Sequence, residues 1–181
     1  TIQTRLRYML FVPWAYQQLE ARRTRSSELG NKLRRLEFDL VEPLLDSMAP
    51  EDRSSAGIFG RMAGRNLKRW PSSIYWAGLT SWGIHRSGLS QEEYNRSLDT
   101  LYVRRDIDRD RRDEGSEPNP TVATWHTSLP TAPKGFPAGA SLDLTMDEAS
   151  FLHDRIIGAH PRSLLAWLAL HGQPSDVSFP W

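Results

Sequence analysis

The chain of 181 residues contains no cysteine. This absence excludes disulfide scaffolds and also zinc or iron–sulfur sites with cysteine ligands. The sequence has no apolar run of the roughly 18 to 20 residues that a membrane span needs, and no signal peptide opens it. We therefore expect a cytoplasmic protein without membrane contact, and the length fits one domain with a core of its own.

Motifs for nucleophilic catalysis and phosphate transfer are also missing. There is no Gly-x-Ser-x-Gly elbow, and Gly57-Ile58-Phe59-Gly60 lacks the Lys-Ser/Thr ending of a phosphate-binding loop. The five histidines are scattered, and even His153 and His160 are seven residues apart, whereas helical metal ligands are more often three or four apart. We expect no catalytic residue, no metal site and no cofactor, which favours a protein that is not an enzyme.

The small net charge of +1 conceals an uneven distribution. Residues 1–86 hold 14 Lys and Arg against 8 Asp and Glu, a balance of +6, and residues 87–181 hold 9 against 14, a balance of −5. A basic half is compatible with an anionic partner, although solvated helix faces explain the same charges.

Hydrophobic periodicity predicts a mainly α fold of about seven helices in a single domain, residues 1–181. The apolar centre of the first helix, residues 8–16, predicts burial on every side. We expect helices over 2–23, 27–48, 56–69, 72–83 and 90–102, one from the Thr145–Glu148 capping box through Ile157, and one from Pro161 to Gly172.

One long irregular loop is expected over residues 104–144, with a charged linker first and an extended arm after it. Trp125, Leu129 and Phe136 suggest that the arm packs across the surface of the domain. In the linker, acidic residues follow a calcium-loop spacing from Asp106 onward. Because the glycine that the motif requires is replaced by Arg111, a charged linker is the better interpretation.

Two motifs carry a resemblance to a known family. The first is Thr1-Ile2-Gln3-Thr4-Arg5, followed by Tyr8 and Leu10-Phe11-Val12-Pro13-Trp14. The second is Pro71-Ser72-Ser73-Ile74-Tyr75-Trp76-Ala77-Gly78-Leu79. With shorter matches further along, the chain resembles an uncharacterised bacterial family, a domain of unknown function, over nearly its whole length.

The resemblance implies no established reaction, cofactor or catalytic residue. It implies further sequence before the first motif, so we expect the chain to be a segment of a longer protein. It also implies a genome-defence context, which favours contact with nucleic acid.

Residues 56–84 resemble a helix-turn-helix, in which the second helix enters the major groove of DNA with its N-terminal residues foremost. Free N–H groups and serine hydroxyls at that end suit a phosphate, and neighbouring cations attract one. The fit is imperfect because the turn falls on Lys68 or Arg69, where glycine is usual. The expected nucleic-acid contacts are Arg65, Lys68, Arg69, Ser72 and Ser73.

An antiparallel helix pair with its aromatic residues in the core is the alternative interpretation of the same segment. In that case the chain is a structural or protein–protein interaction module without nucleic-acid binding. Its aromatic pair and its arm would then dock against other protein subunits or the missing part of its own chain. Tryptophans interleaved with arginines in the basic half could stack on unpaired bases, but burial in the core comes first.

Overall fold

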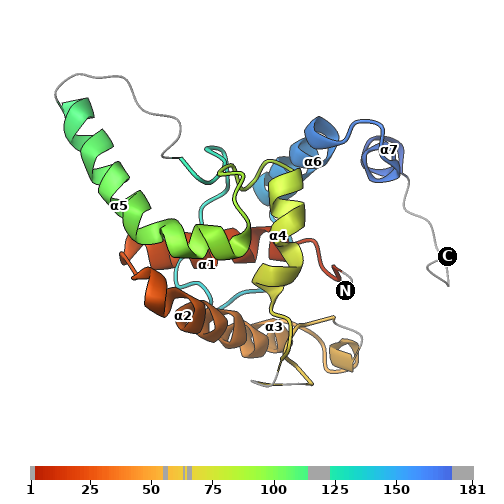
Figure 1. Cartoon of the computed structure of the whole chain (residues 1–181). Coiled ribbons are helices and arrows are strands. Elements are labelled where there is room, and N and C mark those ends of the chain that lie inside the picture. Colours follow the sequence, from red (N-terminus) through yellow and green to blue (C-terminus); the bar gives the residue numbers. More distant parts are fainter. Residues whose placement is uncertain (1–2, 55–56, 63, 65–66, 114–122, 173–181) are drawn as a thin grey trace.

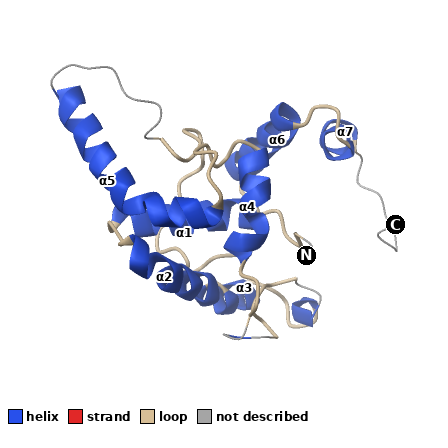
Figure 2. Cartoon of the chain, in the orientation of Figure 1, coloured by secondary structure: helices blue, strands red, loops and turns tan. Residues whose placement is uncertain are grey.

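The computed structural model describes residues 3–54, 57–62, 64, 67–113 and 123–172. Within these ranges it is built from helices and loops and contains no strand (Figures 1 and 2), apart from an isolated bridge between His85 and Trp125. The prediction of a mainly helical fold is confirmed. The elements are α1 (Tyr8–Ala21), α2 (Ser26–Asp39), α3 (Val41–Asp46), the 3-10 turn η1 (Asp52–Ser54), α4 (Pro71–Ser81), α5 (Gln91–Asp113), α6 (Met146–Ala159) and α7 (Leu164–His171).

Helix α1 is the centre of the domain, with α2 and α4 packed on it (Figure 1). Every residue from Tyr8 to Tyr16 is buried, as the apolar run predicted. The expected helix start at residue 2 is wrong, because residues 3–6 precede α1 as a strap over α4. In this strap the Arg5 N–H donates to the Tyr75 hydroxyl at 3.1 Å, and the hydroxyl donates to the Arg5 carbonyl at 2.8 Å.

The helix expected over 27–48 is divided in two at Leu40. Pro43 explains the break, because proline has no N–H and its ring collides with the carbonyl four residues earlier. That carbonyl belongs to Asp39, where α2 ends. Pro43 itself lies in the first turn of α3, where a missing N–H costs nothing.

The first helix of the expected helix-turn-helix is not formed in the part of the segment that the structure describes. Residues 57 and 58 have no regular structure and residues 59–62 make turns, and Gly57 and Gly60 have φ angles of 65° and 86°, which lie in the left-handed region. Residues 63, 65 and 66 lie outside the described ranges. The second helix is present as α4, so the helix-turn-helix interpretation of residues 56–84 is wrong in its first half.

Helix α5 continues eleven residues beyond the expected end near Tyr102 and takes in the charged stretch up to Asp113. Charge pairs at helical spacing explain the continuation: Arg112 contacts Asp108 at 3.2 Å and Arg109 contacts Asp106 at 3.4 Å. The calcium-loop spacing therefore falls on a helix, and its last position, Glu117, lies outside the described residues.

Residues 123–144 cross the core without helix and bury Trp125, Leu129 and Phe136 against it. The indole N–H of Trp14 donates to the Pro130 carbonyl at 2.6 Å, which ties this arm to α1. These three large side chains therefore belong to the chain's own core, while residues 131–135 of the arm are exposed.

The capping box predicted at the start of α6 is present, with reciprocal hydrogen bonds between Thr145 and Glu148. No helix among the described residues is both long and apolar enough to cross a membrane.

Candidate nucleic-acid interface

Of the five predicted contact residues, three are exposed near the start of α4. Lys68 and Arg69 lie in the loop before the helix, and Ser73 lies in its first turn, where its hydroxyl donates to the Trp70 carbonyl at 2.8 Å. Arg65 lies outside the described residues.

Ser72, in contrast, is buried at 3% exposure, and its hydrogen-bonding groups already have a partner within the chain. Its backbone N–H donates to one oxygen of the Glu37 carboxylate, and its hydroxyl donates to the other at 3.2 Å. A carboxylate from α2 therefore fills the helix N-terminus that the sequence suggested for a phosphate. We leave Ser72 out of the proposed interface for this reason.

Burial raises the pKa of Glu37 from 4.5 to about 7, against the opposing effect of the two hydrogen bonds from Ser72. The unfolded chain ionises near pH 4.5, whereas the folded chain keeps this proton until about pH 7. The contribution of Glu37 to stability is thus fully present below pH 4.5 and is lost as the pH rises through 7.

We expect Glu37→Gln to remove the loss of stability between pH 4.5 and 8. Glutamine keeps an oxygen for the Ser72 N–H and carries no charge at any pH in this range. The difference in unfolding free energy between the variant and the native protein should grow by on the order of 3 kcal/mol from about pH 4.5 to about pH 8. Urea denaturation across this range measures it. Glu42→Gln, at an exposed position of α3, is the control and should show no such trend.

The aromatic residues of the basic half lie mostly in the core. Trp14, Tyr75 and Trp76 are at most 7% exposed, and Trp70 and Trp82 are half-buried. Trp76 packs with Trp125 and Tyr94 around His85, which is 1% exposed, and burial lowers the pKa of this histidine to about 4. The buried rings are therefore unavailable for stacking on bases.

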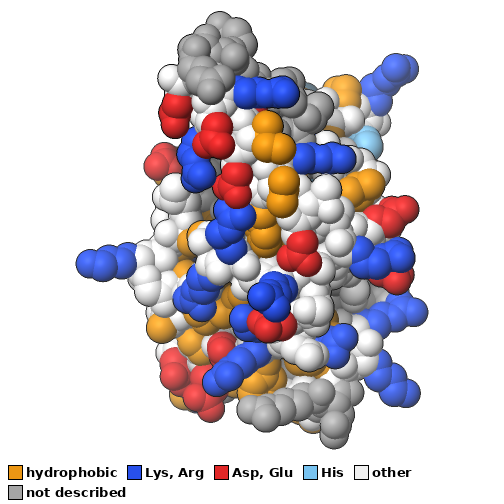
Figure 3. Space-filling model, turned by 60° about the vertical axis from the view of Figure 1, so that its left-hand side comes forward, with side chains coloured by type: hydrophobic (Ala, Val, Ile, Leu, Met, Phe, Trp, Pro, Cys, Tyr) orange, Lys and Arg blue, Asp and Glu red, His pale blue; other side chains and the backbone are white. Residues whose placement is uncertain are grey.

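A second candidate site, away from the start of α4, is a cavity of about 1310 Å³. It lies between α5, the C-terminal end of α1 and the segments 86–89 and 123–127. One stripe of α5 lines it at helical spacing, from Tyr94 through Leu101 to Arg105, Asp108 and Arg112. Figure 3 shows cationic and acidic side chains interspersed on the side of the molecule where α5 lies in Figure 1.

Arginine dominates the charge of this cavity. Six arginines and three carboxylates line it, a formal balance of +3. The arginines are Arg23, Arg86, Arg104, Arg105, Arg109 and Arg112, and the carboxylates are Glu20, Asp106 and Asp108.

The acidic groups of the cavity are already held by arginines. Arg23 forms a bidentate salt bridge with Asp106, with N–O distances of 2.8 and 2.9 Å, and this contact lowers the pKa of Asp106. Arg105 contacts Glu20 at 2.9 Å. Arg86 and Arg104 are exposed and make no ion pair within the described residues, so their charge is available to a ligand.

The floor of the cavity is a rigid polar network around Glu20. This buried carboxylate accepts hydrogen bonds from the Tyr94 hydroxyl at 2.6 Å and from the Trp125 indole at 2.8 Å, in addition to the Arg105 contact. Burial and the nearby carboxylate raise the pKa of Tyr94. Thr124 bonds both Tyr94 and Arg105, so the arm and α5 are fixed to α1 at this point.

The sequence does not predict the cavity, because the charges of residues 104–113 favour a linker there. The helical spacing of Ser97, Leu101, Arg105, Asp108 and Arg112 indicates one wall of the cavity. An expected helix end near Tyr102 leaves the last three of these residues outside the helix, so the spacing is not recognised as a helix face.

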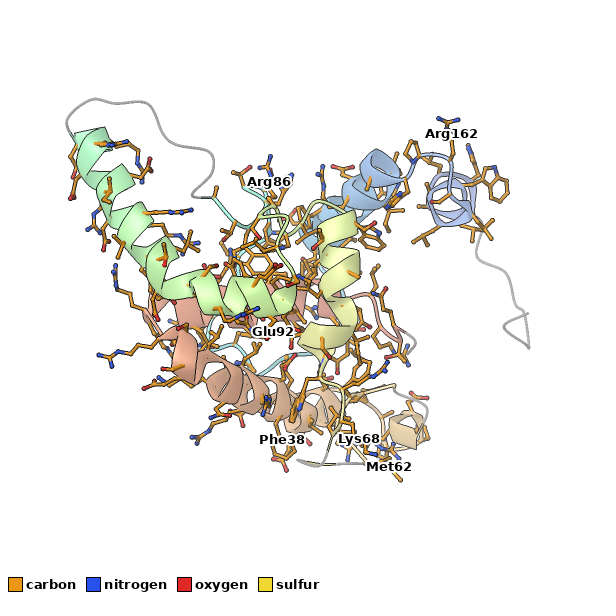
Figure 4. The ribbon with its side chains drawn as sticks, in the orientation of Figure 1. Phe38, Met62, Lys68, Arg86, Glu92 and Arg162 are labelled. Carbon is orange, nitrogen blue, oxygen red and sulfur yellow. The ribbon has the colours of Figure 1, made fainter. Side chains whose placement is uncertain are left out.

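The two basic surfaces are distinct: Arg86 lies in the upper part of the molecule in Figure 4 and Lys68 in the lower part.

Ser87 Oγ lies 3.0 Å from Nε2 of the buried His85, and a second serine–histidine pair at a distance suited to nucleophilic catalysis joins Ser81 Oγ to His160 Nε2 at 2.6 Å. Ser81 and His160 are both exposed. Among the described residues no third group holds the His160 ring, and neither Ser81 nor His160 lines the cavity beside α5. The pair therefore serves as a link between α4 and the end of α6.

Comparison with known proteins gives a family and no function. No curated protein matches the chain, and no solved structure matches it. A family described as a family of unknown function, DUF6361, matches residues 1–181. This agrees with the resemblance found in the sequence motifs, and the chain belongs to the family of unknown function DUF6361.

Proposed function

We propose that this chain is a non-enzymatic, cytoplasmic helical module that binds nucleic acid in a genome-defence context, with the arginine-lined cavity beside α5 as its main phosphate site. The observation that carries the proposal is the surplus of arginines in one concave site, where Arg86 and Arg104 have no acidic partner among the described residues. Phosphodiester groups are the anions that such planar, permanently charged donors suit.

The walls of the cavity favour backbone contacts over base contacts. Tyr94 and Tyr102 line it but are at most 6% exposed, so no tyrosine face is open to a base. Ser87, Ser97 and Thr127 add hydroxyls that bond phosphate and sugar oxygens. We therefore expect binding with little sequence preference and a strong dependence on salt.

Binding of fluorescently labelled single-stranded and duplex DNA, followed by anisotropy at increasing salt, tests the proposal. Arg86→Glu with Arg104→Glu should weaken binding at low salt by about tenfold or more and reduce the salt slope by about 2, because two phosphate contacts are lost. The two arginines are exposed, so the double variant should fold like the native protein.

Arg35→Glu with Arg96→Glu is the matched control, with the same change in net charge at exposed positions outside the cavity. It should retain most of the binding. An equal loss in both double variants would show that overall charge, and not the cavity, is responsible. Absence of binding to either DNA form at low salt would reject the proposed function.

The exposed start of α4 is proposed as a secondary contact through Lys68, Arg69 and Ser73. Lys68→Glu with Arg69→Glu, in the same assay, measures its share separately, because this surface and the cavity lie in different parts of the molecule (Figure 4). If this variant loses more DNA affinity than the cavity variant, the start of α4 is the main contact and the cavity the secondary one.

The second candidate function is a protein–protein interaction module without nucleic-acid binding. The observation that favours it is the apolar surface of α7, on which five large hydrophobic side chains are exposed. DNA binding by the native protein, lost in the cavity variant alone, would decide against this candidate as the sole function.

A further inference from the structure

Helix α7 is apolar on the side that faces away from the domain. It lies at the edge of the molecule and packs on α6 (Figure 1), with Ala166 as its buried residue. Exposed fractions of 47% to 72% remain on five large side chains, which are Leu164, Leu165, Trp167, Leu168 and Leu170. Soluble surfaces rarely leave so many large apolar side chains together without a partner.

The spacing of these side chains makes a continuous face. Leu164 and Leu168 are four apart, and Leu164 with Trp167 and Leu165 with Leu168 are three apart, so each pair is adjacent on the helix surface. The buried Ala166 lies on the side opposite Leu164 and Leu168, and Leu170, four residues after Ala166, lies at the edge of the face. The outward stripe is therefore wide enough to cover a second helix.

Charge around α7 favours a second copy of the same helix in antiparallel orientation. No Lys, Arg, Asp or Glu lies between Ser163 and Gly172, so two such faces bring no like charges together. Arg162 is exposed just before the helix. In an antiparallel pair it reaches the C-terminal end of the partner's α7, where the helix dipole attracts a cation.

We infer that α7 is a self-association surface, through which two copies of this chain pair about a two-fold axis. A two-fold contact uses the same patch on both copies, as an uncharged apolar stripe permits. Covering the five side chains on both copies would remove on the order of 1,000 Å² from solvent, the lower limit for a specific interface. The dimer should therefore be weak and depend on concentration.

Sedimentation velocity of the native chain from about 1 µM to about 200 µM tests the inference, with a shift from monomer to dimer expected over this range. Leu168→Glu places a charge in the centre of the stripe and should weaken association by about tenfold or more. Since Leu168 is 47% exposed, this variant should fold normally, which circular dichroism checks. Arg162→Glu should also weaken the dimer, and Arg162→Lys should retain it.

Met146→Glu is the matched control, because Met146 is 80% exposed at the far end of α6 from α7. It should dimerise like the native chain. A native chain that stays monomeric throughout the range overturns the inference, as does a dimer that Leu168→Glu leaves intact. Binding of a monomeric native chain to phosphatidylglycerol vesicles, lost in Leu168→Glu, would instead assign the face to a lipid surface.

Discussion

Trp14→Ala should lower the free energy of unfolding by about 3 to 5 kcal/mol, a large part of the stability of a domain of this size. Trp14 is 1% exposed in the middle of α1 and packs against Phe11 and Phe136 with ring centroids 5.9 and 5.6 Å away. The substitution empties a volume that these rings cannot fill. It also deprives the Pro130 carbonyl of its donor and loosens the arm from α1.

Urea denaturation followed by circular dichroism measures this change. Trp14→Phe separates the two contributions, because phenylalanine keeps an aromatic ring in the core and loses only the indole N–H and part of the volume. We expect it to cost about 1 to 3 kcal/mol. Trp167→Ala is the matched control at 56% exposure, and at low protein concentration it should change stability by less than about 0.5 kcal/mol. Equal losses at the two tryptophans would contradict a core centred on α1.

The central place of α1 could be predicted because its sequence is apolar on every side. A helix without a polar face over residues 8–16 is expected to be buried on every side by other elements. In the structure all of these residues are buried. The capping box before α6 was equally readable, since both of its side chains are local to the helix start. These features depend on neighbours within a few residues.

The extension of α5 and the cavity beside it depend on contacts between distant segments. Residues 104–113 alternate charges in a way that equally suits a solvated linker, and the helix is favoured by partners such as Glu20 of α1 and Arg23, which follows α1. The occupation of the α4 N-terminus by Glu37 is likewise a contact between residues 35 positions apart. Glu37 lies eight and four residues after the buried Leu29 and Leu33, so helical spacing places it on the buried face of α2, whereas nothing local identifies Ser72 as its partner.

Arg7→Met should lower the free energy of unfolding by about 3 to 5 kcal/mol, because it leaves the Glu148 carboxylate buried without a cation. The two side chains are 7% and 5% exposed and meet at 2.8 Å, joining the start of α1 to α6. Arg7 also donates to the carbonyl and the hydroxyl of Ser141 at 3.0 and 2.8 Å. Methionine fills part of the same volume, so lost charge pairing, more than lost packing, determines the result.

Adding Glu148→Gln to Arg7→Met should recover part of that loss, because glutamine removes the unpaired charge and still serves the capping box with Thr145. Thermal and urea unfolding of the two single variants and the double variant complete the cycle and isolate the pairing energy. Arg23→Met breaks a pair whose side chains are 54% and 35% exposed, so it should cost less than about 1 kcal/mol. If Arg7→Met costs no more than Arg23→Met, water screens the Arg7–Glu148 pair as fully as a surface pair, and α6 is held to α1 by apolar contacts alone.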